Sequence, residues 1–455
     1  MRIRILFLCL FLTLSGIGFS QNNPQAEEVF SRARKERKTI LMIFSGSDWC
    51  LPCIRLEKTI FADSAFLEYA KPKLLVFRVD FPQRKKLSPG EIQANEKLAD
   101  EFNPLGVFPL LLLVNPDRVV ISTLKYERYT TKEFIDEINQ DISGAMTKEY
   151  KAKARLMGSA FEFIVSAESE RGGESLLHEC MQEVSRIEDK LSEFKAASET
   201  SRINALAGKQ PIPVSEETYQ LLKRCLNISA LTRGAFDISA GPLKKLYHFR
   251  NGGFELPSPE KIRDALNKTG FKKIHLGNNH EVFLELSEMH ISFAAIGKGY
   301  AAEKVKALMI DKGVDSGMVN ASGDLTVWGL RPGGRQWKAG IANPERPGEI
   351  LWWLPLNGLS IATSGNYEQY FEYKGLRYSH NINPITGLPV TGIRSASVIS
   401  PGAELSDALA TAVTVMGIDE GIWLVDQLPQ THCIMVDDQN GSHHSKEIHV
   451  NLKNA

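Results

Sequence analysis

The sequence predicts an α/β protein of more than one domain, and three observations support this fold class. The chain has 455 residues, which is too long for one ordinary hydrophobic core and predicts two or three domains. Apolar runs of strand length alternate with helical stretches along the chain. A polar stretch at residues 141–153 separates a shorter first region of this kind from a longer second one, so we interpret it as a linker.

The N-terminus has the pattern of a secretory signal peptide. The basic residues MRIR precede the apolar run ILFLCLFLTL, and Gly18-Phe19-Ser20 resembles a small-x-small cleavage site. A retained membrane anchor is the alternative, although the run is short for a membrane span. We therefore predict a signal peptide at residues 1–20 and an exported protein that is periplasmic or associated with the cell envelope.

The charge balance excludes two classes of partner. Lys and Arg together number 54, and so do Asp and Glu, which leaves a formal net charge of zero. Such a chain has no overall field that would attract nucleic acid or an anionic membrane surface. We predict no nucleic-acid partner, and membrane contact only through neighbouring envelope proteins.

Residues 21–140 form the first predicted domain, with the order helix, strand, helix, strand, helix and then two strands. The polar residues 26–37 read as a helix, and KTILMIFS is an apolar run of strand length. A helical stretch begins at CLPC, and LLVFRVDF is a second buried strand. The segment from Pro104 to Thr123 reads as two strands that turn at Asn115-Pro116-Asp117.

Cys50 and Cys53 form a C-x-x-C motif where the first strand meets a helix. The partial positive charge of a helix N-terminus stabilises a thiolate there. With Trp49 before it, this motif resembles the thioredoxin family, and Pro109 falls where that family has a cis-proline. The resemblance implies that Cys50 is the exposed attacking thiol, that Cys53 is the resolving thiol, and that a thiol redox partner docks at Pro109.

Two alternatives to this interpretation of the cysteine pair stay open. The pair could be half of a zinc site, although no second cysteine or histidine pair of suitable spacing follows. It could also be a structural disulfide in a thioredoxin-like binding module. Cys180 and Cys225 lie on apolar helix faces and are expected to be buried core thiols.

Residues 154–455 form the second predicted domain. It opens with the alternating strand RLMGSAFEFIVSA, and a long amphipathic helix covers about residues 173–192. The stretch ISFAAIGKGYA places Lys298 among small residues where a helix begins near Gly299. Such a helix entrance favours an anion, most often phosphate, although an ordinary tight turn has the same pattern. Asp407 and Thr411, four residues apart in a helical stretch, share one helix face.

Several short motifs follow one another in the order of a known family. The region from about residue 155 to residue 434 resembles the FAD:protein FMN transferases, or ApbE-type flavin transferases. The matching motifs are MGS, SxxSRIN, GAFDIS, AAIGKGYA, VNASGD, IANP, IATSGNYE, HNINPITG and DALATA. The resemblance implies an α/β fold with mixed sheets and helices around a cleft that holds FAD.

The resemblance also implies a reaction and its metal. The family splits the pyrophosphate of FAD with Mg²⁺ and transfers FMN to a Thr or Ser hydroxyl of an acceptor flavoprotein, releasing AMP. Phosphoryl transfer of this kind rests on positioning and charge neutralisation. Mg²⁺ prefers oxygen ligands, and the family ligands map onto the backbone carbonyl of Ala295, the carboxylate of Asp407 and the hydroxyl of Thr411.

Other family positions carry over residue by residue. Lys298 is expected on a phosphate, and His380 is the candidate base, or a cation near the transferred phosphorus. The implied cofactor-binding residues are Met157, Phe194, Ala235, Phe236, Asp237, Lys298 and Asn381.

Each assignment has a simpler alternative. Asp407 could cap a helix, and Thr411 could bond back to the previous helical turn. His380 could be an ordinary loop histidine, and Phe194 could be a core residue.

Three residues depart from the family pattern. Ser292 stands where the family often has an acidic residue, which predicts a weaker polar grip on FAD. Asn383 replaces the aspartate that usually precedes the proline, and Ile385 replaces a basic residue. The change at Asn383 removes a charge near His380.

The leading hypothesis is an exported, Mg²⁺-dependent FMN transferase fused to a thioredoxin-like domain. A thiol-disulfide oxidoreductase with an FAD-binding electron-carrier domain is one alternative. An FAD pyrophosphatase that releases FMN and AMP to water is another.

Overall fold

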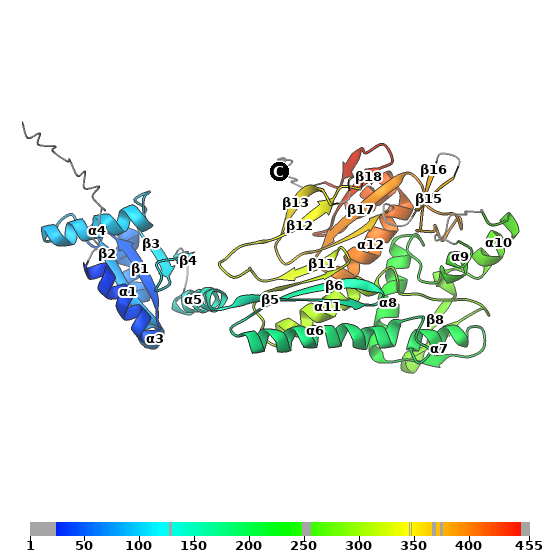
Figure 1. The fold of residues 1–455 in the computed structure, drawn as a ribbon, viewed down its shortest axis with the longest axis horizontal. Helices are drawn as coiled ribbons and strands as arrows, with labels where there is room; N and C mark the ends of the chain where they lie inside the picture. The colour runs from blue at the N-terminus through cyan, green and yellow to red at the C-terminus, as the bar shows by residue number, and fades with distance from the viewer. Residues whose placement is uncertain are drawn as a thin grey trace, which may run out of the picture. The chain divides into compact units, whose positions relative to one another are not determined.

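The computed structural model describes residues 24–126, 130–247, 256–344, 346, 348–365, 370–373 and 376–446 (Figure 1). The predicted signal peptide at residues 1–20 lies outside these residues. The chain divides into two compact units, Met1–Ile142 and Ser143–Ala455, which are described separately. Within the described residues, no helix combines the length and the apolar character needed to cross a membrane.

The first unit is built on a four-stranded mixed sheet with the order β2-β1-β3-β4. Strand β1 pairs in parallel with β2 and antiparallel with β3, and β3 pairs antiparallel with β4. The strands are β1 (Thr39–Ser45), β2 (Leu74–Asp80), β3 (Leu110–Val114) and β4 (Val120–Leu124). The helices are α1 (Pro24–Glu36), α2 (Leu51–Leu56) with a π-helical continuation (Glu57–Phe61), α3 (Ser64–Lys73), α4 (Pro89–Phe102) and α5 (Thr131–Met146).

Helices cover both faces of this sheet, which explains the unbroken apolar sequence of β1. Leu41 and Ile43 pack in a core that includes Phe66 of α3 and Phe134 of α5. The alternate residues of β1, such as Met42, pack on the other face in a core with residues of α1 and α4. A strand buried on both faces has no solvent side, so it does not alternate between apolar and polar residues. The unit has the predicted thioredoxin-like fold.

The boundary between the two units falls within the predicted linker at residues 141–153, but these residues have regular structure. They are divided between the end of α5 and most of β5 (Lys148–Leu156), and the boundary between the two units falls inside α5. Strand β5 pairs with β6 (Ser159–Ala167) along its whole length. Its alternate residues Tyr150, Ala152 and Ala154 pack against the core of the second unit. The lysines between them gave the stretch its polar character, because they lie on the other face of the strand.

The second unit is built on an eight-stranded sheet with the order β19-β18-β17-β14-β11-β10-β6-β5. Each of its neighbouring pairs is antiparallel. The remaining strands of this sheet are β10 (Gly317–Ala321), β11 (Asp324–Trp328), β14 (Ser360–Gly365), β17 (Ile393–Ser400), β18 (His432–Asp437) and β19 (Ser442–His444).

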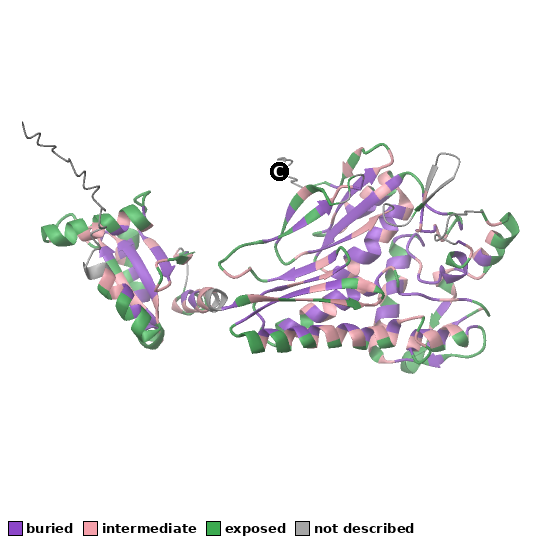
Figure 2. Cartoon of the chain, viewed as in Figure 1, coloured by how far each residue is buried: buried purple, intermediate pink, exposed green. Residues whose placement is uncertain are grey.

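Helices line one face of this sheet and a small hairpin lines part of the other (Figures 1 and 2). The long helices α6 (Glu170–Leu191), α11 (Gly297–Asp311) and α12 (Ala403–Met416) contribute to one large buried core. The hairpin of β12 (Trp337–Ala342) and β13 (Ile350–Leu356) packs with residues such as Ile164 and Val327 in a separate core. Cys180 and Cys225 are buried free thiols, as predicted.

The second unit has five more helices and two small sheets among the described residues, and α13 packs with α12, β17 and β18. The helices are α7 (Glu199–Ala205), α8 (Glu216–Leu231), α9 (Gly241–Lys244), α10 (Pro259–Asn267) and α13 (Ile418–Val425). The small strands are β7 (Ile212–Pro213), β8 (Ile274–Leu276) and β9 (Glu281–Leu284), which form one sheet, and β15 (Tyr370–Tyr373) and β16 (Leu376–Ser379), which form another.

Candidate active site

A cavity of about 890 Å³ in the second unit gathers most of the predicted site residues. Its lining comes from widely separated parts of the chain, including the start of α11, the second and third turns of α12 and the loop after β16. The predicted residues that line it are Ala235, Phe236, Asp237, Ala295, Lys298, His380, Asn381, Asp407 and Thr411. Met157 and Phe194 are not among its lining residues.

Asp407 lies inside α12 and points its carboxylate at the start of α11. The N-cap of α12 is Gly402, so Asp407 is not the capping residue that the sequence left as an alternative. Its Oδ2 accepts a hydrogen bond of 2.9 Å from the backbone N–H of Gly299, and the residue is only 6% exposed. Asp407 and Thr411 both line the cavity, as expected for residues four apart on one helix face.

Lys298 lines the cavity, but its ammonium group pairs with Asp324 at the start of β11. Asp324 is 2% exposed. Burial and then the nearby charge of Asp407 raise the pKa of Asp324 to about 7, while Lys298 opposes the shift. From the sequence, Lys298 was expected on a phosphate and Asp324 had no predicted role. An acidic residue in a turn carries no signal that it will be buried beside a lysine.

The donor set of the cavity fits a hard divalent cation. Asp407 offers a carboxylate, Thr411 a hydroxyl and Ala295 a backbone carbonyl, so all three predicted ligands are oxygens. Among the described residues, no group of three or more His, Cys, Asp or Glu side chains could hold a metal ion.

The turn at residues 235–237 forms a buried wall of the cavity. Ala235 and Phe236 are almost fully buried, and Asp237 follows them. The Asp237 carboxylate accepts hydrogen bonds from the backbone N–H and hydroxyl of Ser239 and from the backbone N–H of Phe271. Burial raises the pKa of Asp237, and these bonds oppose the rise. Asp237 thus braces the turn against the segment at residues 270–271.

His380 follows β16 directly and reaches the cavity beside Asn381. Two hydrogen bonds hold Asn381 in place. Its side-chain amide donates to Ser364 Oγ, and its backbone N–H donates to Ser379 Oγ.

The side-chain oxygen of Asn383 accepts hydrogen bonds from the backbone N–H groups of Ile385 and Thr386, which forms an Asx turn. The amide therefore keeps the turn-forming function that an aspartate would have here. Residues 366–369 of the IATSGNYE motif lie outside the described residues.

Phe194 is 91% exposed and does not reach the cavity, whereas the preceding Glu193 is partly buried. Glu193 accepts a hydrogen bond from Ser292 Oγ, and its second oxygen lies 2.6 Å from His290 Nε2. Burial would raise the pKa of Glu193, but the hydrogen bonds from His290 and Ser292 outweigh it and lower the pKa. Glu193 thus supplies a carboxylate beside Ser292, the position where the family often has an acidic residue.

Met157 lies at the edge of the site rather than in its lining. It adopts a left-handed backbone conformation, and its methyl group would be 3.3 Å from a Cβ placed on Gly297.

Three basic side chains that were not predicted from the sequence also line the cavity: Lys153, Arg155 and Lys244. Lysines spaced along a strand or at a short helix read as a solvated surface, so the pattern gave no signal for them.

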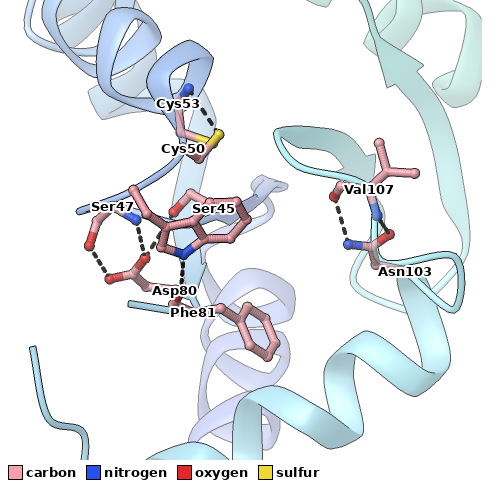
Figure 3. The surroundings of a disulfide bond; sticks show 9 residues. Ser45, Ser47, Cys50, Cys53, Asp80, Phe81, Asn103 and Val107 are labelled. Carbon is pink, nitrogen blue, oxygen red and sulfur yellow. Dashed lines mark hydrogen bonds between the residues drawn. A yellow bond between two sulfur atoms is a disulfide. The ribbon is translucent and has the colours of Figure 1, made fainter. Parts of the chain in front are cut away.

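Cys50 and Cys53 in the first unit are joined in a disulfide at the N-terminus of α2 (Figure 3). Cys50 is the N-cap residue, and its sulfur accepts a hydrogen bond of 3.3 Å from the backbone N–H of Cys53. Cys50 is 5% exposed, so the implied exposed position is wrong for this disulfide form. The Phe108–Pro109 peptide bond is cis, as the resemblance implied. A smaller cavity of about 300 Å³ is lined by Cys53, Pro109 and Asp80, among other residues.

Each of the two units matches a known protein family. A family described as "ApbE family" matches residues 157–435, and one described as "Thioredoxin-like" matches residues 21–116. An FAD:protein FMN transferase of Treponema pallidum is 31% identical over 280 residues, covering 57% of this chain and 77% of that protein. One of Escherichia coli K12 is 34% identical over 234 residues, covering 50% of this chain and 67% of that protein.

Solved structures agree with these matches. The crystal structure of an ApbE protein from Thermotoga maritima has a TM-score of 0.60 and 30% identity, covering 66% of this chain and 97% of that chain. The apo flavinyl transferase ApbE of Pseudomonas stutzeri has a TM-score of 0.59 and 27% identity, covering 66% of this chain and 95% of that chain.

Proposed function

The chain belongs to the ApbE family, and from this premise we propose that its second unit is an FAD:protein FMN transferase. Curated relatives with this name share 31% and 34% identity with the chain. The observation that carries the proposal is the meeting of Lys298, His380 and Asp407 in one cavity of about 890 Å³. These residues come from separate segments and meet only through the fold.

The proposed reaction moves the FMN half of FAD to a Thr or Ser hydroxyl of an acceptor flavoprotein. The acceptor oxygen bonds to the FMN phosphorus, the pyrophosphate P–O bond breaks, and AMP leaves. His380 lines the cavity and is the side chain that would accept the hydroxyl proton. Lys298 and the nearby cations Lys153, Arg155 and Lys244 would hold the negative phosphates in place.

We propose that Mg²⁺ assists this reaction and that the Ala295 carbonyl, Asp407 and Thr411 hold it. When bound, the ion would neutralise charge on the phosphate oxygens. The all-oxygen donor set supports this assignment, since Mg²⁺ prefers oxygen ligands. Asp324 and Lys298 would remain paired beside the metal site and limit its net charge.

The test is incubation of the purified chain with FAD, Mg²⁺ and envelope proteins of the source cell. Covalent flavin fluorescence on an acceptor band in a denaturing gel, together with AMP release, is the expected result. AMP without a fluorescent acceptor would favour the FAD pyrophosphatase. Bound FAD with neither product would favour an electron-carrier domain and would overturn both enzymatic proposals.

A second candidate function belongs to the first unit. We propose that it exchanges thiols and disulfides with a partner protein, because Cys50 and Cys53 form a disulfide at a helix N-terminus and Cys53 lines one cavity with Pro109. A dithiol-driven insulin reduction assay should show turnover that Cys50→Ser abolishes. A flat result in the unmodified chain would instead indicate a docking module with a structural disulfide.

We further propose that the protein is exported and that its acceptor flavoprotein lies in the cell envelope. The basic start, apolar run and small-x-small site at residues 1–20 support this proposal. The mature protein recovered from the envelope fraction should begin at Gln21. Recovery of the uncleaved chain in the cytoplasm would contradict it.

A further inference from the structure

Two rigid loops border the disulfide of the first unit. The first loop, which we name the basic loop, comprises residues 83–86 after β2 and carries Arg84, Lys85 and Lys86, all exposed. The second, which we name the apolar loop, comprises residues 103–108 before β3 and carries the exposed Leu105 and Val107. Neither loop has a role in the FMN transfer proposed for the second unit.

Asp48 fixes the basic loop to the cysteine motif. Its carboxylate accepts the backbone N–H groups of Gln83, Arg84 and Lys85 at 2.8, 2.6 and 2.9 Å. Since Asp48 is two residues before Cys50, the backbone that carries the lysines is tied directly to the reactive turn. The Asp48 carboxylate bonds to this backbone, and the charge of Arg84 helps to lower the pKa of Asp48, as that of Lys85 does for Glu91. Lys86 has no such acidic neighbour among the described residues.

Trp49 strengthens the same connection and extends it to the apolar loop. Its indole N–H donates to the backbone carbonyl of Phe81 at 2.7 Å. Its ring meets the Phe108 ring edge to face, with centroids 5.6 Å apart, and Phe108 also meets the Phe81 ring at 5.5 Å. Phe81, two residues before the basic loop, and Phe108, the last residue of the apolar loop, therefore belong to one aromatic cluster with Trp49, which directly precedes Cys50.

The apolar loop is held closed by a reciprocal pair of hydrogen bonds (Figure 3). The Asn103 side chain donates to the Val107 carbonyl and accepts from the Val107 N–H, both at 2.9 Å. Leu105 is 88% exposed, and Leu51 within the C-x-x-C motif is 77% exposed. Because the backbone of this loop is already held in place, little backbone entropy is lost when a partner covers its exposed apolar side chains.

We propose that this surface docks an extended, acidic segment of a partner protein that carries the disulfide to be exchanged. The apolar residues Leu51, Leu105 and Val107 would cover the segment next to its cysteines, and Lys85 and Lys86 would meet its carboxylates. The proposal rests on the thiol-disulfide exchange proposed above and adds the chemistry of the partner. In the exchange, an external dithiol first reduces the Cys50–Cys53 disulfide to two thiols. These thiols give two electrons and two protons to the partner's disulfide, which becomes a dithiol while the Cys50–Cys53 disulfide forms again.

The test compares two synthetic peptides of equal length, each with one internal disulfide between flanks that are either acidic or basic. The full chain is first reduced at Cys50 and Cys53, and the rate of peptide reduction is measured at low and high ionic strength. The buried Cys180, Cys225 and Cys433 do not compete. We expect the acidic peptide to react about tenfold faster at low salt, because charge steering raises encounter rates by at least that factor. High salt should remove the difference.

The variant K85E/K86E should lose or reverse the preference, while its reaction with a small neutral disulfide stays unchanged. The matched control K35E/K71E changes the same charge near the starts of β1 and β2, roughly 20 Å along the strands from the cysteine end. It should keep the preference. Equal rates for both peptides, or the same loss in both variants, would overturn the docking proposal alone. Failure to reduce even the small disulfide would overturn the exchange function as well.

Discussion

The backbone N–H of Gly299 donates a hydrogen bond of 2.9 Å to Oδ2 of Asp407. This contact joins the first turn of α11 to the interior of α12, two segments more than a hundred residues apart in sequence. A Cβ on Gly299 would lie 2.2 Å from the Ala403 carbonyl oxygen and 2.7 Å from Asp407 Cβ. The glycine is required because two helices touch there, and not because a ligand approaches its backbone.

We predict that Gly299→Ala destabilises the second unit and abolishes FMN transfer. The added methyl group would meet the backbone of α12, which cannot move aside as a side-chain end can. Overpacking of this kind costs roughly 1–3 kcal/mol or more and would displace Asp407. Thermal unfolding and FMN transfer should both be measured. Gly297→Ala is the matched control, since its Cβ would lie 3.3 Å from the flexible end of Met157 and at an ordinary 3.7 Å from Phe293 Cβ. Equal effects of the two substitutions would contradict this explanation.

Asp407→Asn should abolish Mg²⁺-dependent transfer with little loss of stability. The amide oxygen can still accept the Gly299 N–H, so the helix contact survives while the charge for the metal is lost. Asp407→Ala should lose the same activity and also roughly 1–3 kcal/mol of stability, because it leaves that N–H unsatisfied. Transfer assays over a range of Mg²⁺ concentrations and urea unfolding separate the two effects. Unchanged Mg²⁺ dependence in Asp407→Asn would refute the metal assignment.

The sequence predicted most of the cavity because its residues lie in short motifs. Lys298 and His380 each sit in a local pattern, and both line the cavity as expected. The helix spacing of Asp407 and Thr411 also gave their shared face correctly. Residues whose role depends only on distant neighbours escaped prediction. Asp324 is an example, because its pairing with Lys298 arises only when β11 and α11 are brought together by the fold.

Strand β5 inside the predicted linker escaped prediction for a related reason. Residues 148–153 are polar on one side only, and a strand with one solvated face looks like a loop when its partner strand is unknown. Phe194 differs from its prediction in another way, since the resemblance implied a cofactor-binding residue, whereas the structure places its side chain at the surface and outside the cavity lining. Its neighbour Glu193 is the residue that the fold turns inward.

Moving the carboxylate from position 193 to position 292 tests whether Glu193 takes the place of the acidic residue that the family often has at position 292. Ser292→Asp would place two carboxylates side by side, and one must take a proton or be repelled. We predict lower thermal stability for this variant, with a larger loss at alkaline than at acidic pH. Adding Glu193→Gln should restore stability, and FAD binding followed by flavin fluorescence should then match or exceed that of the unmodified chain. If the double variant is no more stable than Ser292→Asp alone, Glu193 does not take the place of an acidic residue at position 292.

Glu217 connects three helices behind the site and should set part of the acid stability of the second unit. Its carboxylate accepts hydrogen bonds from Arg186 and Lys190 of α6 and from the Tyr300 hydroxyl of α11, at 2.6–2.9 Å. The Arg186 hydrogen bonds are the largest cause of the lowered pKa of Glu217, and those of Lys190 and Tyr300 add to it. Because Tyr300 lies in the first turns of α11, this network also holds the helix that carries Lys298.

The sign of the pH effect follows from that lowered pKa. The unfolded chain binds a proton at Glu217 near pH 4.3, whereas the folded chain binds it only at lower pH, so the stabilisation is complete above that value and disappears as the pH falls. Glu217→Gln should therefore lose roughly 1.5–3 kcal/mol near neutral pH and progressively less in acid. Glu183→Gln is the control, because Glu183 bonds Arg186 within α6 itself and joins no second helix. Calorimetric unfolding of the full chain across the acid range gives both curves. If the difference in free energy of unfolding between Glu217→Gln and the unmodified chain stays constant down to strongly acidic pH, the carboxylate charge does not hold these helices together.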